Sequence, residues 1–357
     1  NRRNFLGKRP RQKQLGYMKI LFNKIKIFIL SNKIISGSFV MVLGSFLGSL
    51  TGYLFHLIVA RSLGPKDYGI LDSLISIMYQ LSIPLATISL VIVKYVSSFK
   101  GQGRKETISS FFWKINKKLF ILLPVALVLM FFLTPLVTNF LHLSSPSFFI
   151  LIFLSFLLGI FITVEKSFFQ GLILFEKLTF IGILEGLFRL ALAVLLLSLG
   201  WGLMGAVFPF FLAGIFSFCL SSFFLKTIWQ GKRTEPITEK REMLSFVFPA
   251  FFTNLGTTLL ITSDIILARH FLSAEQAGFY SALSTLGKII FFTASPVTGV
   301  IFPMVSEAHA AKKKINQIVL PGLLIIGFIT LGCLFVFGFF PKIMILALFG
   351  QKYLVLA

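Results

Sequence analysis

Acidic residues are scarce in this sequence. Only 12 Asp and Glu residues stand against 34 Lys and Arg residues, and charged residues make up 13% of the 357 positions. Hydrophobic residues make up 56%, and the mean hydropathy is +0.92. Soluble domains average about 45–50% apolar residues even when glycine is counted among them. The composition therefore excludes an ordinary soluble protein and indicates that lipid surrounds most of the chain.

Cysteine is nearly absent, and so are the motifs of common catalytic sites. The two cysteines, Cys219 and Cys333, lie in apolar runs at no spacing typical of a disulfide framework or a metal site. The sequence contains no HExxH motif, no P-loop and no pair of aspartates at a useful spacing. We therefore expect a protein that is not an enzyme and that needs neither cofactor nor metal.

The excess of basic residues gives a formal net charge of +22. Such a charge can indicate nucleic-acid binding, but here the basic residues fall between long apolar runs rather than on one folded face. The anionic surface of a cytoplasmic membrane leaflet attracts Lys and Arg residues that flank membrane spans. We therefore predict a lipid bilayer as the partner of these residues, and no nucleic acid.

Nine apolar runs are long enough to cross a membrane, which takes about 20 residues. Backbone groups in lipid must find their hydrogen bonds within the segment, so each run is predicted to be a helix and the fold class to be an all-α, polytopic membrane protein. The runs cover residues 34–59, 69–96, 119–141, 147–170, 179–200, 203–225, 245–268, 278–304 and 318–340.

Lys and Arg residues are divided unevenly between the two sets of connections that alternate along these runs. One side of the membrane receives 27 of the 34, and the other side receives five. Positively charged connections mark the cytoplasmic side. The first run is too long for a signal peptide and has no cleavage pattern, so it is a retained span. We predict a multi-pass protein of the cytoplasmic membrane with a cytoplasmic N-terminus.

Two polar stretches between runs resemble each other. "RSLGPKDYG" (Arg61–Gly69) and "RHFLSAEQAG" (Arg269–Gly278) both follow an alanine and lead into the next run at glycine. Further similarities follow at an offset of about 206–209 residues, which predicts an internal repeat. Six spans separate the copies, so the two halves have the same orientation, as in transporters built from parallel repeats.

The repeat divides the chain into two bundles, of which the second stops after its third span. We therefore expect this chain to be a fragment of a protein with at least twelve spans. The predicted parts are a basic cytoplasmic segment (1–33), a first bundle of six spans (34–225), a cytoplasmic linker (226–244) and an incomplete second bundle (245–357).

The stretch "ARSLGPKDYG", with "LFGQKY" near the C-terminus, resembles the polysaccharide (Wzx-type) flippases of the multidrug/oligosaccharidyl-lipid/polysaccharide exporter superfamily. The resemblance covers roughly residues 34–357. It implies two six-helix bundles that form a V around a central cavity. It also implies transfer of an undecaprenyl-diphosphate-linked oligosaccharide by alternating access, with glycan polymerases or glycosyltransferases as candidate partners. The family pattern names no catalytic residue, so none is carried over.

Ionisable side chains inside the runs are candidates for the transport site, because each costs about 2.5–3.5 kcal/mol to insert at the membrane centre. Glu185 and Arg189 lie four residues apart in one run, so they share a helix face and can pair. Arg189 suits bidentate contact with a diphosphate, and Glu185 would orient it. The alternative is a self-neutralised pair that holds helices together. Lys288 lies near the middle of the eighth run.

Three further groups are candidates for ion coupling. Asp264 in the seventh run could pair with Lys288, and this pair could either hold the helices together or act as an ion-coupling switch. The repeat places His56 at the position equivalent to Asp264. A lone histidine near a helix end is more often an interfacial residue. Asp72 could cap the start of the second span, where a negative charge is favoured. Glu165 and its neighbour Lys166 are expected to snorkel at the membrane interface.

The motif residues Arg61, Gly64, Pro65 and Gly69 have a structural interpretation. Gly-Pro is a turn signal, and Gly69 permits a close approach where the second span begins. We expect these residues to form a tight hairpin that recurs because the fold is duplicated. Pro84, inside the second run, can form a hinge, although proline is common in membrane helices.

Three other functions compete with the flippase. A cation-coupled multidrug antiporter of the same superfamily would need an acidic or aromatic cavity, whereas the mid-membrane charges here are Arg189 and Lys288. A membrane polymerase or ligase would need a sizeable outer loop or clustered catalytic groups, and the outer loops are short. A non-catalytic scaffold in envelope synthesis would not need buried cations.

Overall fold

The computed structural model describes residues 33–231, 241–289 and 316–356, and these residues form helices and short connections without a strand. The helices are α2 (Lys33–Leu63), α3 (Pro65–Leu81), α4 (Ile83–Gly101), α5 (Lys105–Phe140), α6 (Ser147–Gly171), α7 (Phe175–Ser198), α8 (Gly202–Phe224), α9 (Lys226–Trp229), α10 (Arg241–Phe271), α12 (Asn316–Phe339), α13 (Pro341–Leu348) and the 3₁₀ helix η1 (Gln351–Leu356). Residues 274–289 are also helical.

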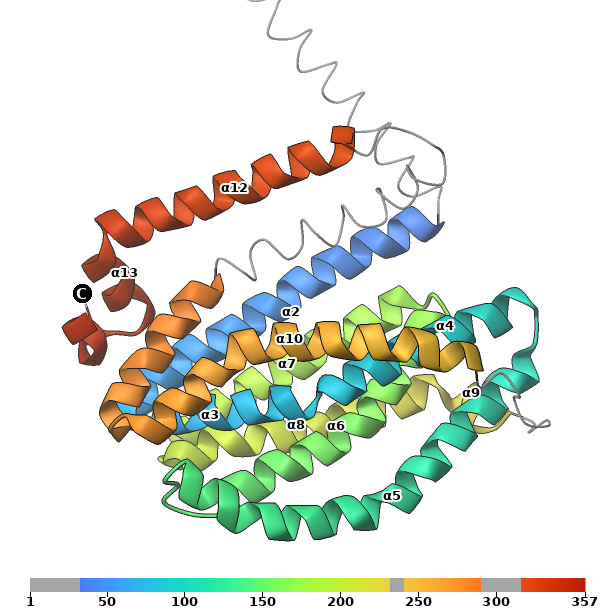
Figure 1. Cartoon of the computed structure of the whole chain (residues 1–357), viewed down its shortest axis with the longest axis horizontal. Helices are drawn as coiled ribbons and strands as arrows, with labels where there is room; N and C mark the ends of the chain where they lie inside the picture. Colours follow the sequence, from blue (N-terminus) through green and yellow to red (C-terminus); the bar gives the residue numbers. More distant parts are fainter. Residues whose placement is uncertain (1–32, 232–240, 290–315, 357) are drawn as a thin grey trace, which may run out of the picture.

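The long helices run side by side along one axis (Figure 1). Eight helices in the described part of the chain are long and apolar enough to cross a membrane, so the prediction of an all-α membrane protein is confirmed. The predicted run 278–304 and the basic segment 1–33 lie wholly or partly outside the described residues. The count of nine spans therefore stays a prediction.

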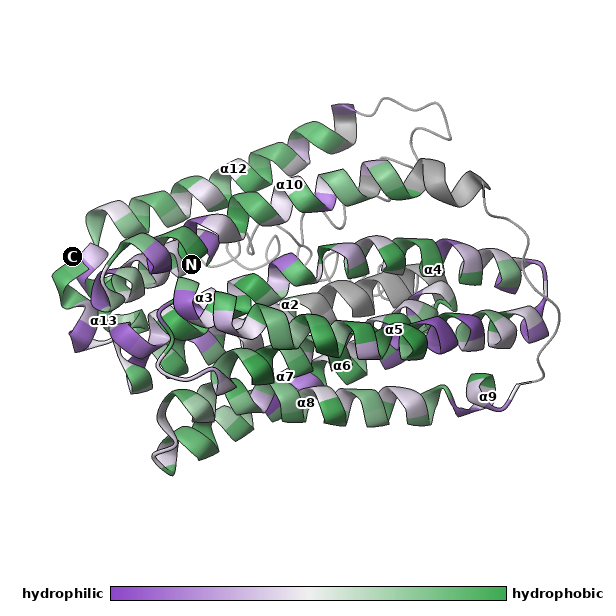
Figure 2. Ribbon diagram, turned by 60° about the horizontal axis from the view of Figure 1, so that its bottom comes forward, coloured by the Kyte–Doolittle hydropathy of each residue, from purple (hydrophilic) through white to green (hydrophobic). Residues whose placement is uncertain are grey.

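The outer faces of the bundle are apolar. Figure 2 shows hydrophobic residues along the helices, and Phe131 and Phe132 of α5 are 74% and 68% exposed. Phe328 of α12 is also exposed. Contiguous exposed apolar surface of this extent is rare on soluble proteins and marks contact with a membrane or a partner. This surface is consistent with lipid around the helices.

The second predicted span is not one helix. The structure divides residues 69–96 between α3 and α4, with the break at Ser82. Pro84 stands in the first turn of α4 and cannot donate a backbone hydrogen bond to the preceding turn. The Ser82 N–H donates instead to the Met78 and Tyr79 carbonyls, at 3.0 and 3.1 Å. The expected interruption at Pro84 is therefore present, as a break two residues earlier.

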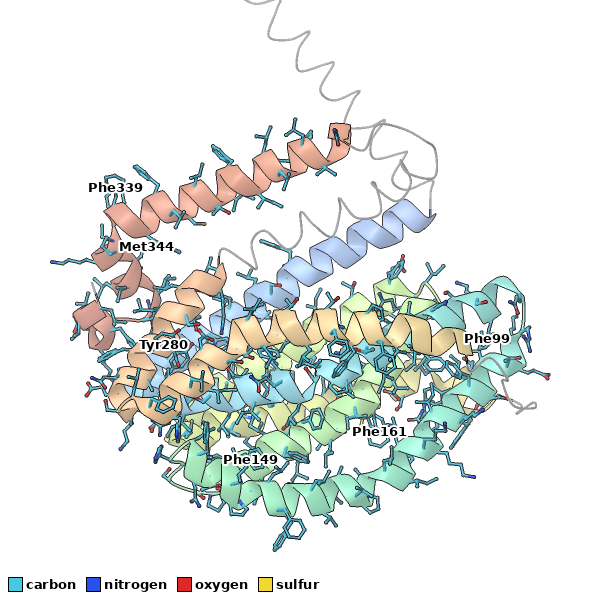
Figure 3. All side chains as sticks on the ribbon, in the orientation of Figure 1. Phe99, Phe149, Phe161, Tyr280, Phe339 and Met344 are labelled. Atoms are coloured by element: carbon cyan, nitrogen blue, oxygen red, sulfur yellow. The ribbon has the colours of Figure 1, made fainter. Side chains whose placement is uncertain are left out.

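For the description, we call residues 33–231 the first half and residues 241–289 and 316–356 the second half. The first half (33–231) packs α2 on α7, α7 on α8, α8 on α6 and α6 on α4. In the second half (241–289 and 316–356), α10 lies along α3 and α4 of the first half. Phenylalanine and tyrosine side chains contribute to two buried hydrophobic clusters (Figure 3). The cluster around Phe55, Tyr68 and Phe149 includes residues of both halves, and the other lies around Phe112 and Phe168.

The hairpin between α2 and α3 has the predicted turn. Gly64 adopts a φ of +81°, which few residues other than glycine accept, and Pro65 begins α3. Gly69 meets Gly278 of the second half: a methyl group on Gly69 would lie 2.8 Å from Gly278 Cα. A methyl group on Gly278 would overlap the Pro65 carbonyl. Glycine at both positions therefore lets two helices from different halves touch through their backbones.

Replacing either glycine should separate these helices. We expect Gly69→Val and Gly278→Val each to lower stability by about 1–3 kcal/mol, the usual cost of overpacking, and to lower the unfolding temperature in detergent. Gly256→Ala is the control, because no atom lies near its Cβ position and alanine favours a helix. An unfolding temperature for Gly69→Val and Gly278→Val equal to that of Gly256→Ala would contradict the close contact.

Candidate functional site

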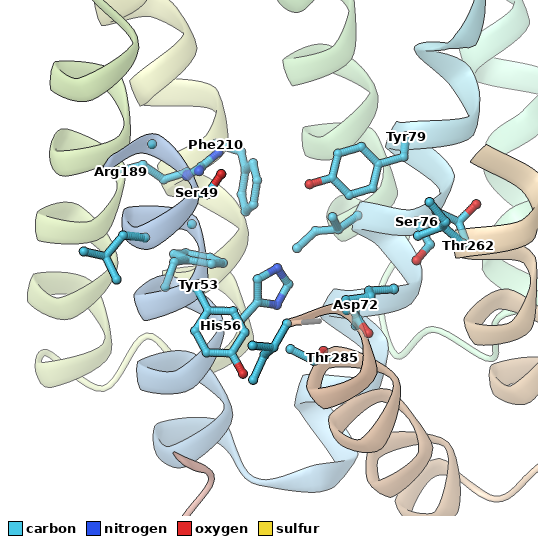
Figure 4. Close-up of a pocket in the computed structure, with 18 of the residues that line it drawn as sticks. Ser49, Tyr53, His56, Asp72, Ser76, Tyr79, Arg189, Phe210, Thr262 and Thr285 are labelled. Atoms are coloured by element: carbon cyan, nitrogen blue, oxygen red, sulfur yellow. The ribbon is translucent and has the colours of Figure 1, made fainter. Parts of the chain in front are cut away.

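A cavity of about 660 Å³ lies between the two halves. Its walls come from α2, α3, α7 and α8 of the first half and from α10 and helix 274–289 of the second (Figure 4). Of the candidate residues, Arg189, Lys288, His56 and Asp72 line it, whereas Glu185 and Asp264 do not. The structure therefore gathers four of the six predicted side chains around one space.

Arg189 reaches the cavity wall from α7. Its guanidinium carbon lies 4.9 Å from the centre of the Phe210 ring and 5.6 Å from that of Phe55. Ring faces attract a cation without neutralising it. The buried Nε has no hydrogen-bond partner, and no carboxylate forms an ion pair with Arg189 among the described residues. Arg189 is thus a positioned cation with unused donor capacity.

The predicted pair between Glu185 and Arg189 was wrong. Glu185 Oε2 accepts a hydrogen bond from Lys166 Nζ of α6 at 2.6 Å and another from Ser217 Oγ of α8 at 2.7 Å. Spacing along one helix places Glu185 and Arg189 on one face, but Lys166 approaches from the neighbouring helix and is the closer partner. Glu185 therefore joins three helices of the first half and does not orient Arg189.

The prediction that Glu165 and Lys166 snorkel at the interface was also wrong. Glu165 is 1% exposed, and its Oε1 accepts a hydrogen bond from Ser222 Oγ at 2.6 Å. Lys166 is held by Glu185 inside the bundle. Both side chains thus turn toward the helix bundle, where Ser222 and Glu185 provide polar partners.

Asp72 and Lys288 line the cavity from opposite halves. Asp72 is 3% exposed, and its Oδ2 atom has no hydrogen-bond partner. The prediction that Asp72 caps the second span was wrong, because it lies two turns into α3 and the acidic residue of the first turn is Asp67. Its burial in the cavity wall makes Asp72 a candidate for function rather than for helix capping.

Asp264 does not pair with Lys288. Its Oδ2 atom accepts hydrogen bonds from Tyr280 and Ser284, both at 3.1 Å, and no ion pair within the described residues joins it to a lysine. Helix 274–289 turns these hydroxyls toward Asp264 and places Lys288 in the cavity instead. The prediction of an Asp264–Lys288 pair was therefore wrong.

His56 lines the cavity and is not an isolated interfacial residue. Its Nδ1 lies 3.1 Å from the Tyr68 hydroxyl, which lies 2.9 Å from Thr285 Oγ1. These contacts connect α2, α3 and helix 274–289, so they cross from the first half to the second. Figure 4 shows His56 between the α2 and α3 walls.

Several lining residues were missed by reasoning from the sequence. Ser49 and Tyr53 precede His56 on α2, and Ser76 and Tyr79 follow Asp72 on α3. Polar residues three or four apart share one face of a helix, so this spacing was an available signal. The phenylalanines of the wall carried no signal, because phenylalanine is abundant throughout the chain.

Residues 34–309 match a protein family described as "Polysaccharide biosynthesis protein". The chain belongs to this family. The match spans most of the chain and confirms the resemblance to the Wzx-type proteins. The family description connects the chain to polysaccharide biosynthesis. No curated protein sequence matches the chain.

Solved structures of the MOP superfamily share the fold of this family member. An inward-facing multidrug resistance MATE transporter is 13% identical, with a TM-score of 0.65 over 88% of this chain and 76% of that one. An outward-facing MATE transporter is 14% identical, with a TM-score of 0.59 over 90% and 76%. A MOP transporter from Pyrococcus furiosus, described as having a binding pocket of reverse polarity, is 13% identical, with a TM-score of 0.52 over 91% and 84%.

The Lys166–Glu185 ion pair gives a direct test of the bundle. We expect Glu185→Gln and Lys166→Met each to cost about 1–3 kcal/mol, less than for a fully buried pair because both side chains are about a quarter exposed. The double variant should cost less than the sum, which unfolding in detergent would measure. Glu176→Gln, an exposed carboxylate on the same helix, is the control. Additive costs for the two changes would show that the pair contributes nothing.

Proposed function

We propose that this protein is a transporter that moves an undecaprenyl-diphosphate-linked oligosaccharide across the cytoplasmic membrane for export of a surface polysaccharide. The observation that carries the proposal is the placement of two cations, Arg189 from the first half and Lys288 from the second, in the wall of one cavity between the halves. A diphosphate that contacts both would neutralise Arg189, which has no carboxylate partner among the described residues, and would compete with Asp72 for Lys288.

The charge of the cavity favours an anionic substrate. Arg189 and Lys288 outnumber the one lining carboxylate, Asp72. Hydrogen bonds from charged donors to phosphate are about twice as strong as neutral ones, and a guanidinium can make two at once. Charges act over longer distances in a low-dielectric interior than in water. These terms support binding of a diphosphate at mid-membrane depth.

The rest of the wall suits the sugars next to the diphosphate. Hydroxyl groups of Ser76, Thr262 and Thr285 can donate and accept hydrogen bonds, and Tyr53 and Tyr79 add a ring as well as a hydroxyl. The volume of about 660 Å³ lies within the range of small-ligand pockets, about 300–1,000 Å³. A diphosphate with its first sugars fits this volume, and a longer glycan would extend beyond it.

Transport would proceed by alternating access between two parallel-repeat bundles in a V arrangement. Cavity walls drawn from both halves support this, because sites of repeat-built transporters lie at the interface between the repeats. With the N-terminus in the cytoplasm, glycosyltransferases would supply the substrate on that side. A glycan polymerase would consume it on the other.

Ion coupling, where it occurs, is assigned to Asp72 and His56 rather than to Asp264. Asp72 and His56 line the cavity, where a bound anion and a proton can influence each other. Asp264 lies outside it, held by Tyr280 and Ser284. The Asp72–Lys288 arrangement supports a role for Asp72 in releasing Lys288 to the substrate.

Lipid transfer in liposomes tests this proposal. The full-length protein is reconstituted with a fluorescent undecaprenyl-diphosphate sugar in one leaflet. Arg189→Ala and Lys288→Ala should each slow transfer by about tenfold or more, the effect of losing about 1.4 kcal/mol or more of charge-assisted binding. Lys342→Ala, which removes an exposed lysine of α13 away from the cavity, should leave the rate unchanged.

Other results would point elsewhere. Transfer at the wild-type rate in both cavity variants would keep the flippase and remove the cationic site. Movement of drug cations without lipid transfer would favour the multidrug antiporter. Absence of both under every ion gradient would favour a scaffold in envelope synthesis.

A further inference from the structure

The arginine that opens the repeated stretch, Arg61, contacts the opposite half. It lies in the last turn of α2, and its Nε donates to the Leu348 carbonyl at 3.0 Å. Its Nη2 donates to the Ala347 carbonyl. Ala347 and Leu348 end α13 of the second half. One guanidinium thus binds two carbonyls at the end of a helix about 286 residues away in the chain.

Arg269, the matching arginine, makes the reverse contact. It lies in the last turn of α10, and its Nε donates to the Leu141 carbonyl at 2.9 Å. Its Nη2 donates to the His142 carbonyl at 3.1 Å. Leu141 and His142 follow the end of α5 in the first half. Arg269 is 4% exposed, so carbonyl oxygens replace water around its charge.

Both contacts lie beside a left-handed residue at a helix end, although Arg61 binds carbonyls two positions earlier relative to that residue than Arg269 does. His142 (φ +50°) and Gly350 (φ +87°) both adopt the left-handed conformation that follows a helix end. Their sequence separation of 208 residues equals that between Arg61 and Arg269. Each half thus has an arginine at the end of its first long helix. Each half also has a helix end whose carbonyls accept hydrogen bonds from the arginine of the other half. Because the contacts are reciprocal, they are not an isolated feature of one loop.

Helix ends explain why arginine serves here. The last carbonyls of a helix lack partners within it and carry the negative end of the helix dipole. A guanidinium offers two parallel N–H donors and a charge of the favourable sign. Neighbouring contacts reinforce each site: Tyr353 donates to the Ala60 carbonyl at 3.3 Å, and the His270 ring stacks on Phe140 at 4.0 Å.

Both arginine sites lie at the end of the molecule where α2 turns into α3, which we call the hairpin end. Arg61 lies five residues beyond His56 on α2, or about 7.5 Å along the helix axis. The cavity therefore ends just before these contacts. At the same end, Gly69 touches Gly278, and Tyr68 is hydrogen-bonded to Thr285.

We propose that Arg61 and Arg269 form two reciprocal latches that hold the cavity closed at the hairpin end. The halves cannot separate there while either guanidinium stays on the carbonyls of the opposite half. Opening at this end requires both arginines to leave, and each must then exchange helix carbonyls for water or headgroups. The latches therefore favour the conformation in which the hairpin end is shut. The proposal does not depend on the substrate.

Accessibility of a cavity cysteine to an impermeant maleimide tests the latches. In the full-length protein, Cys219 and Cys333 are replaced by serine, and Ser76→Cys places one thiol in the cavity wall. Lys352→Cys, an exposed position near Gly64, identifies the membrane side of the hairpin end. Arg61→Ala and Arg269→Ala should each speed labelling of Ser76→Cys from that side by about tenfold, equivalent to about 1.4 kcal/mol.

A matched control distinguishes the loss of a latch contact from the loss of a positive charge at the hairpin. Lys66→Ala removes an exposed cation from the same hairpin, and within the described residues no hydrogen bond or ion pair joins Lys66 to the other half. It should leave labelling unchanged, while a double Ala variant should label faster than either single one. Arg269→Lys fills the buried site if Arg269→Ala fails to fold, and it should also speed labelling because lysine cannot bind two carbonyls as a fork. Wild-type labelling rates in Arg61→Ala and Arg269→Lys, or equal acceleration by Lys66→Ala, would overturn the proposal.

Discussion

The structure depends on one constraint, which is that a polar group surrounded by lipid and apolar side chains must find its partner inside the protein. Backbone groups meet this constraint by forming helices, and all elements of the described chain are helical. Side chains and helix ends have fewer kinds of partner available. The position of each charged residue follows from the partner that it has.

The buried charged residues have four kinds of partner. Glu185 is neutralised by Lys166, and Glu165 is hydrogen-bonded to Ser222. Arg269 is solvated by two helix-end carbonyls. Arg189 has only ring faces, which leave part of its charge and its Nε unsatisfied. Glu185 and Arg269 have polar partners from neighbouring elements, whereas Glu165 Oε2 and Arg189 Nε have none. Of these two residues only Arg189 lines the cavity, which is why it is the functional candidate.

Reasoning from the sequence recovered the features that depend on neighbours along the chain. Run length predicted the membrane helices, and Gly64-Pro65 predicted the turn after α2. It failed where partners come from other helices. The spacing of Glu185 and Arg189 gave their common face but could not reveal Lys166 on α6, and Asp264 was matched with Lys288 because its hydroxyl partners are not marked by charge. The similarity between Arg61 and Arg269 was visible, yet their contacts with the opposite halves required the folded arrangement.

The contact between Gly69 and Gly278 gives the molecule a fulcrum. Two backbones that touch without intervening side chains can rotate about their contact with little change in packing, whereas interlocked side chains resist such rotation. Arg269 lies near this point, and Arg241 lies about 40 Å from Arg269 along α10 at about 1.5 Å per residue. A given rotation of the second half would thus produce a small displacement at the arginines and a much larger one at the far end of α10. The distance from the Gly69–Gly278 contact to the moving end is long on the side away from the hairpin and short beside the hairpin.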